Sequence, residues 1–146
     1  MTKLELINTK YLLLEIDDLN LDALRQEDRR KEVLSLLAVN TQIKVQEKCG
    51  ALFDWMQNGG KLNIVVSRSI DLLMRDGYLT FGIKGNLYRD LLLKPYTTGT
   101  ANAQVSQMSS LLPMLKLILN DGAGTFVPNP KSILLMRLKI ELGLTP

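Results

Sequence analysis

The sequence predicts a mainly α-helical domain of about five helices with one short β-hairpin. Apolar residues recur with helical spacing over residues 21–57, 64–76 and 105–119. After Gly77 the apolar spacing changes to two, which is typical of a strand. The chain has 146 residues, 46% of them hydrophobic, and this matches one domain that can bury a core.

The helix expected over residues 64–76 and the ribbon after it are the centre of this prediction. Gly77 can adopt the left-handed conformation that ends a helix. Beyond it apolar and polar residues alternate, and residues 84–86 (Lys-Gly-Asn) favour a tight turn because Gly and Asn tolerate positive φ. The sequence therefore predicts a hairpin over residues 78–93 with Lys84 at its tip.

Two further helices are expected before this centre, over residues 21–39 and 43–57. Asn20 or Asp22 can cap the first of them. Residues 3–16 favour one or two short strands and also fit a helix. We expect the core to contain Val45, Cys49, Leu52, Phe53, Met56, Ile70, Leu73, Leu112, Leu115 and Leu119.

The C-terminal third is expected to begin with a polar connector over residues 96–104. Residues 105–119 then return to helical spacing, with Pro113 either at a kink or in the first turn of a new helix. Residues 131–144 fit both a helix and a strand pattern. Asn129 before a proline is typical of a helix start, so we favour the helix.

Composition limits the classes of function. The chain has no histidine, which is the commonest general base and metal ligand. It has no phosphate-loop, paired-cysteine or nucleophile-elbow motif. Its one cysteine, Cys49, lies on an apolar helical face and is expected to be a buried structural thiol. We therefore expect a protein that is not an enzyme and uses no metal or small-molecule cofactor.

The same features predict a cytoplasmic location. A single cysteine allows no internal disulfide, which is typical of a reducing compartment. Charged residues interrupt every apolar segment, so no membrane-spanning segment is expected. The N-terminus lacks the apolar region of a signal peptide.

Positive charge is concentrated in the centre of the sequence. Residues 1–58 carry 8 basic and 10 acidic side chains, residues 59–94 carry 6 and 3, and residues 95–146 carry 4 and 2. The net charges are therefore −2, +3 and +2, which sum to the overall +3. A basic centre favours nucleic acid as a partner, whether DNA or RNA.

Candidate binding residues lie in and around this basic centre. Arg68 and Arg75 are seven residues apart and share one side of the expected helix. Arginine binds guanine edges or phosphates through its planar fork, and serine can reach either. The expected nucleic-acid contacts are Ser67, Arg68, Asp71, Arg75, Lys84, Arg89 and Lys94.

A second charged run precedes the centre, over residues 25–32. The simpler interpretation is a solvated helix surface with ion pairs between residues one turn apart. The alternative is that Arg29 and Arg30 contact phosphate.

The stretch from residue 32 to residue 94 resembles the winged helix-turn-helix superfamily of DNA-binding domains. Residues 32–40 look like its first helix, 45–56 like its second and 64–76 like its recognition helix, and Gly-Tyr-Leu at 77–79 looks like the exit into the wing. The second helix is longer than is usual in the family, and the turn after it is a loose Asn-Gly-Gly.

The resemblance implies base contacts near Ser67, Arg68 and Asp71 and a backbone contact from Lys84. It also implies duplex binding through a recognition helix and a basic hairpin, without catalysis.

The whole chain, residues 1–146, is expected to be one domain, with a winged-helix-like core at 32–94 and a helical extension at 105–142. It would act as a homodimer or within a larger protein complex, away from membranes. One alternative is a helical small subunit of a nucleoprotein complex, such as a CRISPR surveillance complex, that binds nucleic-acid backbone without sequence specificity. Another is a protein-interaction module that uses the apolar seam of residues 105–119.

Overall fold

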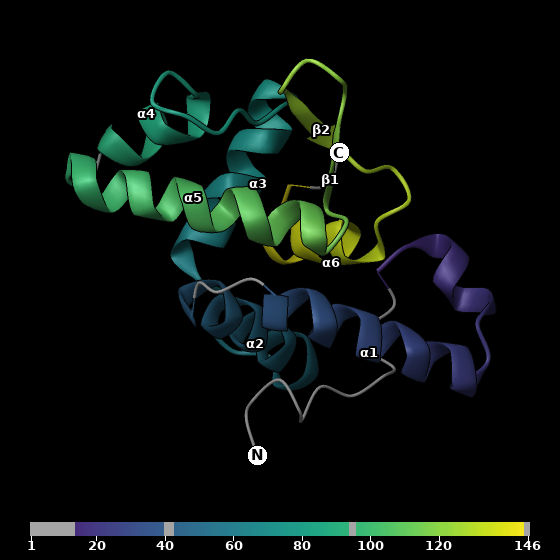
Figure 1. The fold of residues 1–146 in the computed structure, drawn as a ribbon. Helices are drawn as coiled ribbons and strands as arrows, with labels where there is room; N and C mark the ends of the chain where they lie inside the picture. The colour runs from purple at the N-terminus through teal and green to yellow at the C-terminus, as the bar shows by residue number, and fades with distance from the viewer. Residues whose placement is uncertain (1–13, 40–42, 94–95, 145–146) are drawn as a thin grey trace.

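The structure is a computed structural model and describes residues 14–39, 43–93 and 96–144. Figure 1 shows α5 across the middle of the molecule, α4 and the hairpin on one side of it, α1 and α2 on the other, and α3 crossing behind it. The elements are the 3-10 helix η3 (Ile16–Asn20), α1 (Ala23–Val39), α2 (Ile43–Asn58), α3 (Ile64–Asp76), α4 (Asn86–Leu93), α5 (Thr98–Met114), β1 (Ile118–Asn120), β2 (Phe126–Pro128) and α6 (Ile133–Glu141). The predicted class, mainly α with a short antiparallel hairpin, is confirmed.

The predicted position of the hairpin is wrong. The hairpin joins β1 to β2, with Leu119 opposite Val127, whereas residues 86–93, predicted to be a return strand, form α4. Leu87 and Leu91 are fully buried on this helix. They are four residues apart, which places both on one helical face.

Asn86 fixes the loop that precedes α4. Its buried side chain accepts a hydrogen bond from the backbone N–H of Thr80 (2.9 Å) and donates to the backbone oxygen of Tyr78 (2.9 Å) and to the Asp76 carboxylate (3.2 Å). Gly85 packs so closely here that a Cβ would lie 2.4 Å from the Thr80 carbonyl oxygen. The Gly-Asn pair therefore closes a tight loop and starts a helix.

Helix α3 begins and ends where the sequence predicts. The Asn63 side chain accepts hydrogen bonds from two backbone N–H groups of the first turn, and Gly77 ends the helix with a φ of 82°. Leu79 then forms an isolated antiparallel bridge with Phe126 of β2, through backbone hydrogen bonds of 2.8 and 2.9 Å. This bridge joins the end of α3 to the distant hairpin.

Helix α5 starts earlier and ends earlier than predicted. It begins at Thr98, inside the expected connector, and Pro113 lies in its last turn. Lys116, with a φ of 60°, belongs to the sharp turn into β1. Leu119 lies on that strand with 45% of its surface exposed, so its assignment to the core is wrong.

The two ends of the described chain agree with the sequence in part. Residues 133–141 form α6, which confirms the helix over the strand. Its cap is Ser132, whose hydroxyl accepts a hydrogen bond from the Leu135 N–H at 2.9 Å, and not Asn129. At the start of α1, Asp22 accepts the Arg25 N–H at 2.9 Å, as expected of a cap. Most of the ambiguous segment 3–16 lies outside the described residues.

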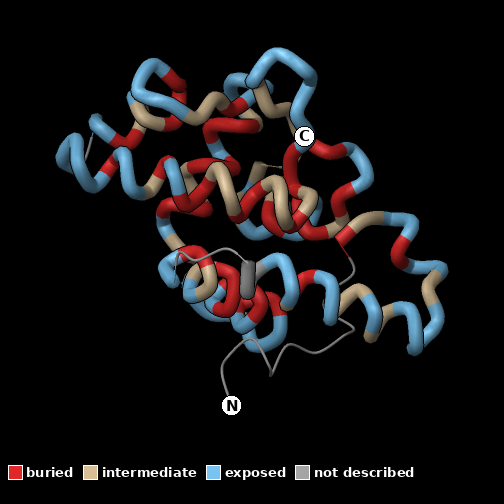
Figure 2. Tube along the Cα trace, in the orientation of Figure 1, coloured by how far each residue is buried: buried red, intermediate tan, exposed pale blue. Residues whose placement is uncertain are grey.

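The core gathers where α5 meets α2, α3 and α4. Figure 2 shows buried residues along the inward faces of these helices. The remaining nine predicted core residues are buried, Cys49 and Phe53 among them. Trp55 is buried as well, and the Arg137 guanidinium lies 5.7 Å from the centre of its ring. No helix in the described part of the chain is long and apolar enough to cross a membrane.

Candidate nucleic-acid interface

The two arginines predicted on α3 converge on one carboxylate of α4. Asp90 lies 3.1 Å from Nη2 of Arg68 and 3.6 Å from Nη2 of Arg75. Arg68 also donates to the backbone oxygen of Asp90, and its guanidinium lies 5.8 Å from the centre of the Tyr96 ring. Arg68 therefore ties α3 to α4 and to the segment before α5.

Arg75 is more exposed and has three acidic neighbours. Its guanidinium nitrogens lie 3.9 Å from Asp71, 3.7 Å from Asp76 and 3.6 Å from Asp90. Exposed ion pairs of this kind add little stability. The three carboxylates also repel a phosphate, because both groups are negatively charged. The arginines of α3 are thus locally balanced by acid.

The other predicted residues of the basic centre are spread around α3 and α4. Lys84 is exposed in the loop before α4, and Arg89 is exposed on α4, where its Nε donates to the Gly85 oxygen at 3.4 Å. Ser67 donates its hydroxyl to the Asn63 oxygen at 3.0 Å. Lys94 lies outside the described residues.

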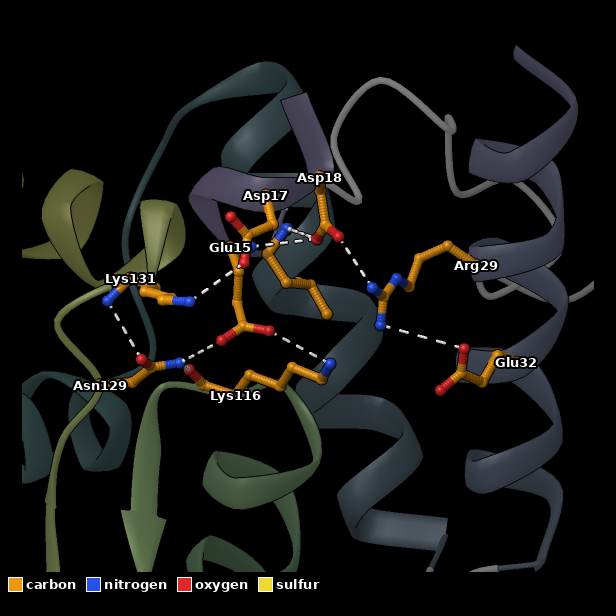
Figure 3. Close-up of polar contacts among 9 residues, drawn as sticks. Glu15, Asp17, Asp18, Arg29, Glu32, Lys116, Asn129 and Lys131 are labelled. Carbon is orange, nitrogen blue, oxygen red and sulfur yellow. Dashed lines mark hydrogen bonds and ion pairs between the residues drawn. The ribbon is translucent and has the colours of Figure 1, made fainter. Parts of the chain in front are cut away.

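Arg29 and Arg30 on α1 both make ion pairs. Arg30 lies 3.5 Å from Glu27 on the same helix. Arg29 lies 2.8 Å from Asp18, which is buried in η3. Figure 3 shows this contact at one end of a polar network between the N-terminal segment and the rest of the chain. The solvated-helix interpretation therefore fits Arg30 better than Arg29.

The centre of the network is Glu15. Its carboxylate accepts a hydrogen bond from Asn129 Nδ2 at 2.9 Å and lies 3.2 Å from Lys116 Nζ. These contacts, the Asn129 hydrogen bond foremost, lower the pKa of Glu15, while burial opposes the shift. Asp18 accepts the backbone N–H groups of Leu14 and Glu15, both at 3.0 Å. These polar groups satisfy one another, and the network joins the segment around Glu15 to Arg29, Lys116 and Asn129.

Helix α5 presents an uncharged polar face that sequence reasoning missed. Its 17 residues include no charged side chain. Asn102, Ala103 and Ser106 are exposed, whereas Ala101 and Val105 are buried. Asparagine and serine reach both phosphates and base edges. The signal was present in the sequence, since Ala101, Val105, Met108 and Leu112 are spaced 4, 3 and 4 and define the opposite face.

The hairpin loop, residues 121–125, lies beside Lys84. The two segments line a shared hollow of about 340 Å³ that includes Lys84, Gly85 and Gly124. The rings of Phe81 and Phe126 pack beside it, 5.1 Å between centres and 59° between planes. Lys84 thus supplies a positive charge next to the hairpin that the chain does form, although it belongs to a different loop.

The site has no feature of a metal centre among the residues described. No group of three or more His, Cys, Asp or Glu side chains there could hold a metal ion. Comparison of the chain with protein-family models, with curated proteins and with solved structures found no match.

Proposed function

We propose that the protein is a non-catalytic nucleic-acid-binding protein that contacts duplex through α5 and the β1–β2 hairpin. The observation that carries the proposal is the order of elements: α3, the bridge at Leu79, α4, α5, and a hairpin whose second strand pairs with Leu79. Four residues, 94–97, separate α4 from α5. This order resembles the winged helix-turn-helix superfamily over residues 64–128, further along the chain than the sequence indicated.

Two arguments favour α5 over α3 as the contacting helix. In a helix-turn-helix, the second helix after a turn of three or four residues enters the major groove. Helix α5 is the second of two consecutive helices, α4 and α5, with four residues between them, whereas α3 precedes both. In addition, the open face of α5 carries no acidic residue, whereas Asp71 and Asp76 are exposed on α3. A phosphate therefore meets less repulsion at α5.

The contacts available to this surface predict moderate affinity. Asn102 can pair with an adenine edge, and Ser106 can reach a base or a phosphate. Lys84, in the loop before α4, and Arg89, on α4, are exposed cations. Each neutralised phosphate contributes a slope of about −0.9 to the logarithm of the binding constant against the logarithm of salt. Two such contacts predict a slope of about −2 for duplex.

The first experiment compares two variants with the same change of charge. Ala103→Glu places a carboxylate on the open face of α5, and Gln57→Glu places one on an exposed position of α2. Binding to a fluorescent generic duplex and to a generic single strand at low salt is measured by anisotropy. We expect Ala103→Glu to weaken duplex binding by about tenfold, equivalent to about 1.4 kcal/mol, and Gln57→Glu to have little effect. Equal effects, or no binding by the unaltered protein, would contradict the proposal.

Lys84→Ala tests the contribution of the hairpin side. It should weaken binding to all duplex sequences alike and reduce the magnitude of the salt slope by about one unit. A salt titration of the variant against the unaltered protein measures this change. An unchanged slope would place Lys84 outside the interface.

A second candidate function is that of a subunit in a larger assembly, including a nucleoprotein complex. Among the α1 side chains that the structure describes, only Val33 is buried, and Leu24 and Leu36 are exposed. A helix that buries so few of its side chains against its own chain leaves most of its surface available to a partner protein. Light scattering after size exclusion separates the two candidates. A sequence-specific regulator should be a stable dimer alone, and a subunit should be monomeric or prone to aggregate.

A further inference from the structure

A second hollow lies between α2 and α5, apart from the surface proposed for duplex. Its volume is about 610 Å³, which is within the range of about 300–1,000 Å³ usual for small-molecule sites. Lys44, Glu47 and Lys48 of α2 line it on one side and Gln104 and Gln107 of α5 on the other, with Asn63 beside them. The wall therefore combines two cations, one carboxylate that lies 3.4 Å from Lys44, and three amides.

Lys48 is held in this hollow by Gln107. Its Nζ donates a hydrogen bond to Oε1 of Gln107, a side chain that is itself buried. Burial lowers the pKa of Lys48, and the neighbouring charge of Lys44 lowers it further, while the Glu47 carboxylate opposes the shift. An anionic group bound beside the two lysines would favour their charged forms and offset this cost.

Gln104 adds a group that lacks a partner. Its Oε1 atom is buried and accepts no hydrogen bond from any described residue. A buried acceptor left without a donor costs about 1–3 kcal/mol, and natural proteins rarely keep one without a ligand or water to satisfy it. A ligand that fits this hollow therefore has an N–H or O–H donor for Gln104 and an anionic group for the lysines.

We propose that this hollow binds a nucleotide, with its phosphate at Lys44 and Lys48 and its base or sugar donor at Gln104. Lysine binds phosphate as a point charge, and amide side chains hydrogen-bond base edges, so both halves of a nucleotide have a counterpart in the wall. The nucleotide can be free or can be one unit of a strand. Both sources share this chemistry.

The proposal is independent of duplex binding through the open face of α5. Gln104 and Gln107 line the hollow, whereas Asn102 is exposed on the opposite side of α5. Asn102→Glu should therefore leave nucleotide binding unchanged even where it abolishes duplex binding. Failure of one proposal is thus separable from failure of the other.

The test is isothermal titration of the full chain with AMP, GMP, CMP and UMP, and with inorganic phosphate and adenosine as the separate halves. We expect at least one nucleotide to bind about tenfold more tightly than phosphate or its nucleoside. A short oligonucleotide of the same base, titrated alongside, shows which source is preferred. Absence of nucleotide binding up to about 1 mM, or equal binding of phosphate alone, would overturn the proposal.

Three variants locate the bound nucleotide. Lys48→Gln removes the cation, Gln104→Leu removes the buried acceptor, and Lys31→Gln removes an exposed lysine of α1 as the matched control. Each of the first two should weaken binding by about tenfold, and the control should not. Thermal melts establish that each variant is folded, and Gln104→Leu serves as the test if Lys48→Gln is not. Unchanged affinity in a folded Gln104→Leu would rule the site out.

Discussion

At the scale of single residues, Glu15 links the stability of the fold to pH. Its pKa is lowered from the ordinary value of 4.5, chiefly by the Asn129 hydrogen bond and also by Lys116. A depressed carboxyl pKa stabilises the folded state above the unfolded pKa, and this stabilisation is lost as pH falls through the folded pKa. The polar network of Figure 3 should therefore stabilise the fold less in acid, below about pH 4.5.

Glu15→Gln tests this dependence. The variant keeps the shape of the side chain but loses its charge, so we expect it to lower the free energy of unfolding by about 1–2 kcal/mol at pH 7. In acid, as the pH falls through the lowered pKa of Glu15, the difference between variant and native protein should shrink, and pH 3 is chosen as the acid condition. Urea unfolding at both pH values measures the effect, with Glu141→Gln on α6 as the control for loss of an exposed carboxylate. A difference that is independent of pH would refute the assignment.

The predicted site residues show what one sequence can and cannot reveal at this scale. Spacing correctly placed Arg68 and Arg75 on the same side of α3, since both reach Asp90. Their neutralisation by Asp90 could not be predicted, because that residue was assigned to a strand. The Glu15–Asn129 contact joins positions 114 apart, and no local pattern encodes such a pair.

At the scale of secondary structure, α4 shows how a short apolar segment misleads. In a stretch of eight residues, Leu87 and Leu91 fit a period of two as well as a helical period. Asn86 favours the helix over the strand. Its side chain hydrogen-bonds the backbone of Tyr78 and Thr80, so these groups are not available to pair with a return strand. Helices α2 and α3 were predictable because their apolar stripes run over three or more turns.

Asn86→Ala should therefore destabilise the protein strongly. The change removes the acceptor for the Thr80 N–H and the donor to the Tyr78 oxygen, both within a partly buried loop. We expect a loss of about 2–4 kcal/mol, since two backbone groups lose their partners. Chemical denaturation gives the value, and Asn102→Ala on the exposed face of α5 is the matched control. A loss as small as that of the control would show that water replaces the lost contacts.

At the scale of the whole molecule, the fold class could be predicted from the sequence, but the position of the hairpin could not. Helical periodicity and one change of period were enough for a mainly α chain with a hairpin, and nine of ten expected core residues are buried. The position of the hairpin depends on the pairing of Leu79 with Phe126, a contact between distant segments. The duplex-binding proposal depends on the same pairing, because it joins the hairpin to the end of α3.

Cys49 reports on the integrity of this whole arrangement. It is fully buried on α2, the helix that packs on α5, and burial raises the pKa of its thiol to about 12. Labelling requires an accessible thiolate that attacks the reagent, and burial in the folded state prevents both access and ionisation. Since the chain has one cysteine, any labelling comes from this position.

We expect native Cys49 to react with a disulfide reagent at least about a hundredfold more slowly than in denaturant, because reaction requires opening of the core. As urea increases, the labelling rate should rise in parallel with loss of helical circular dichroism if the core opens as one unit. A ligand that binds only the folded state should slow labelling further, in proportion to its saturation. Duplex and nucleotide can each be tested in this way. Rapid labelling in native buffer would show that α2 separates from α5 without global unfolding, and the hollow between them would then be a transient feature.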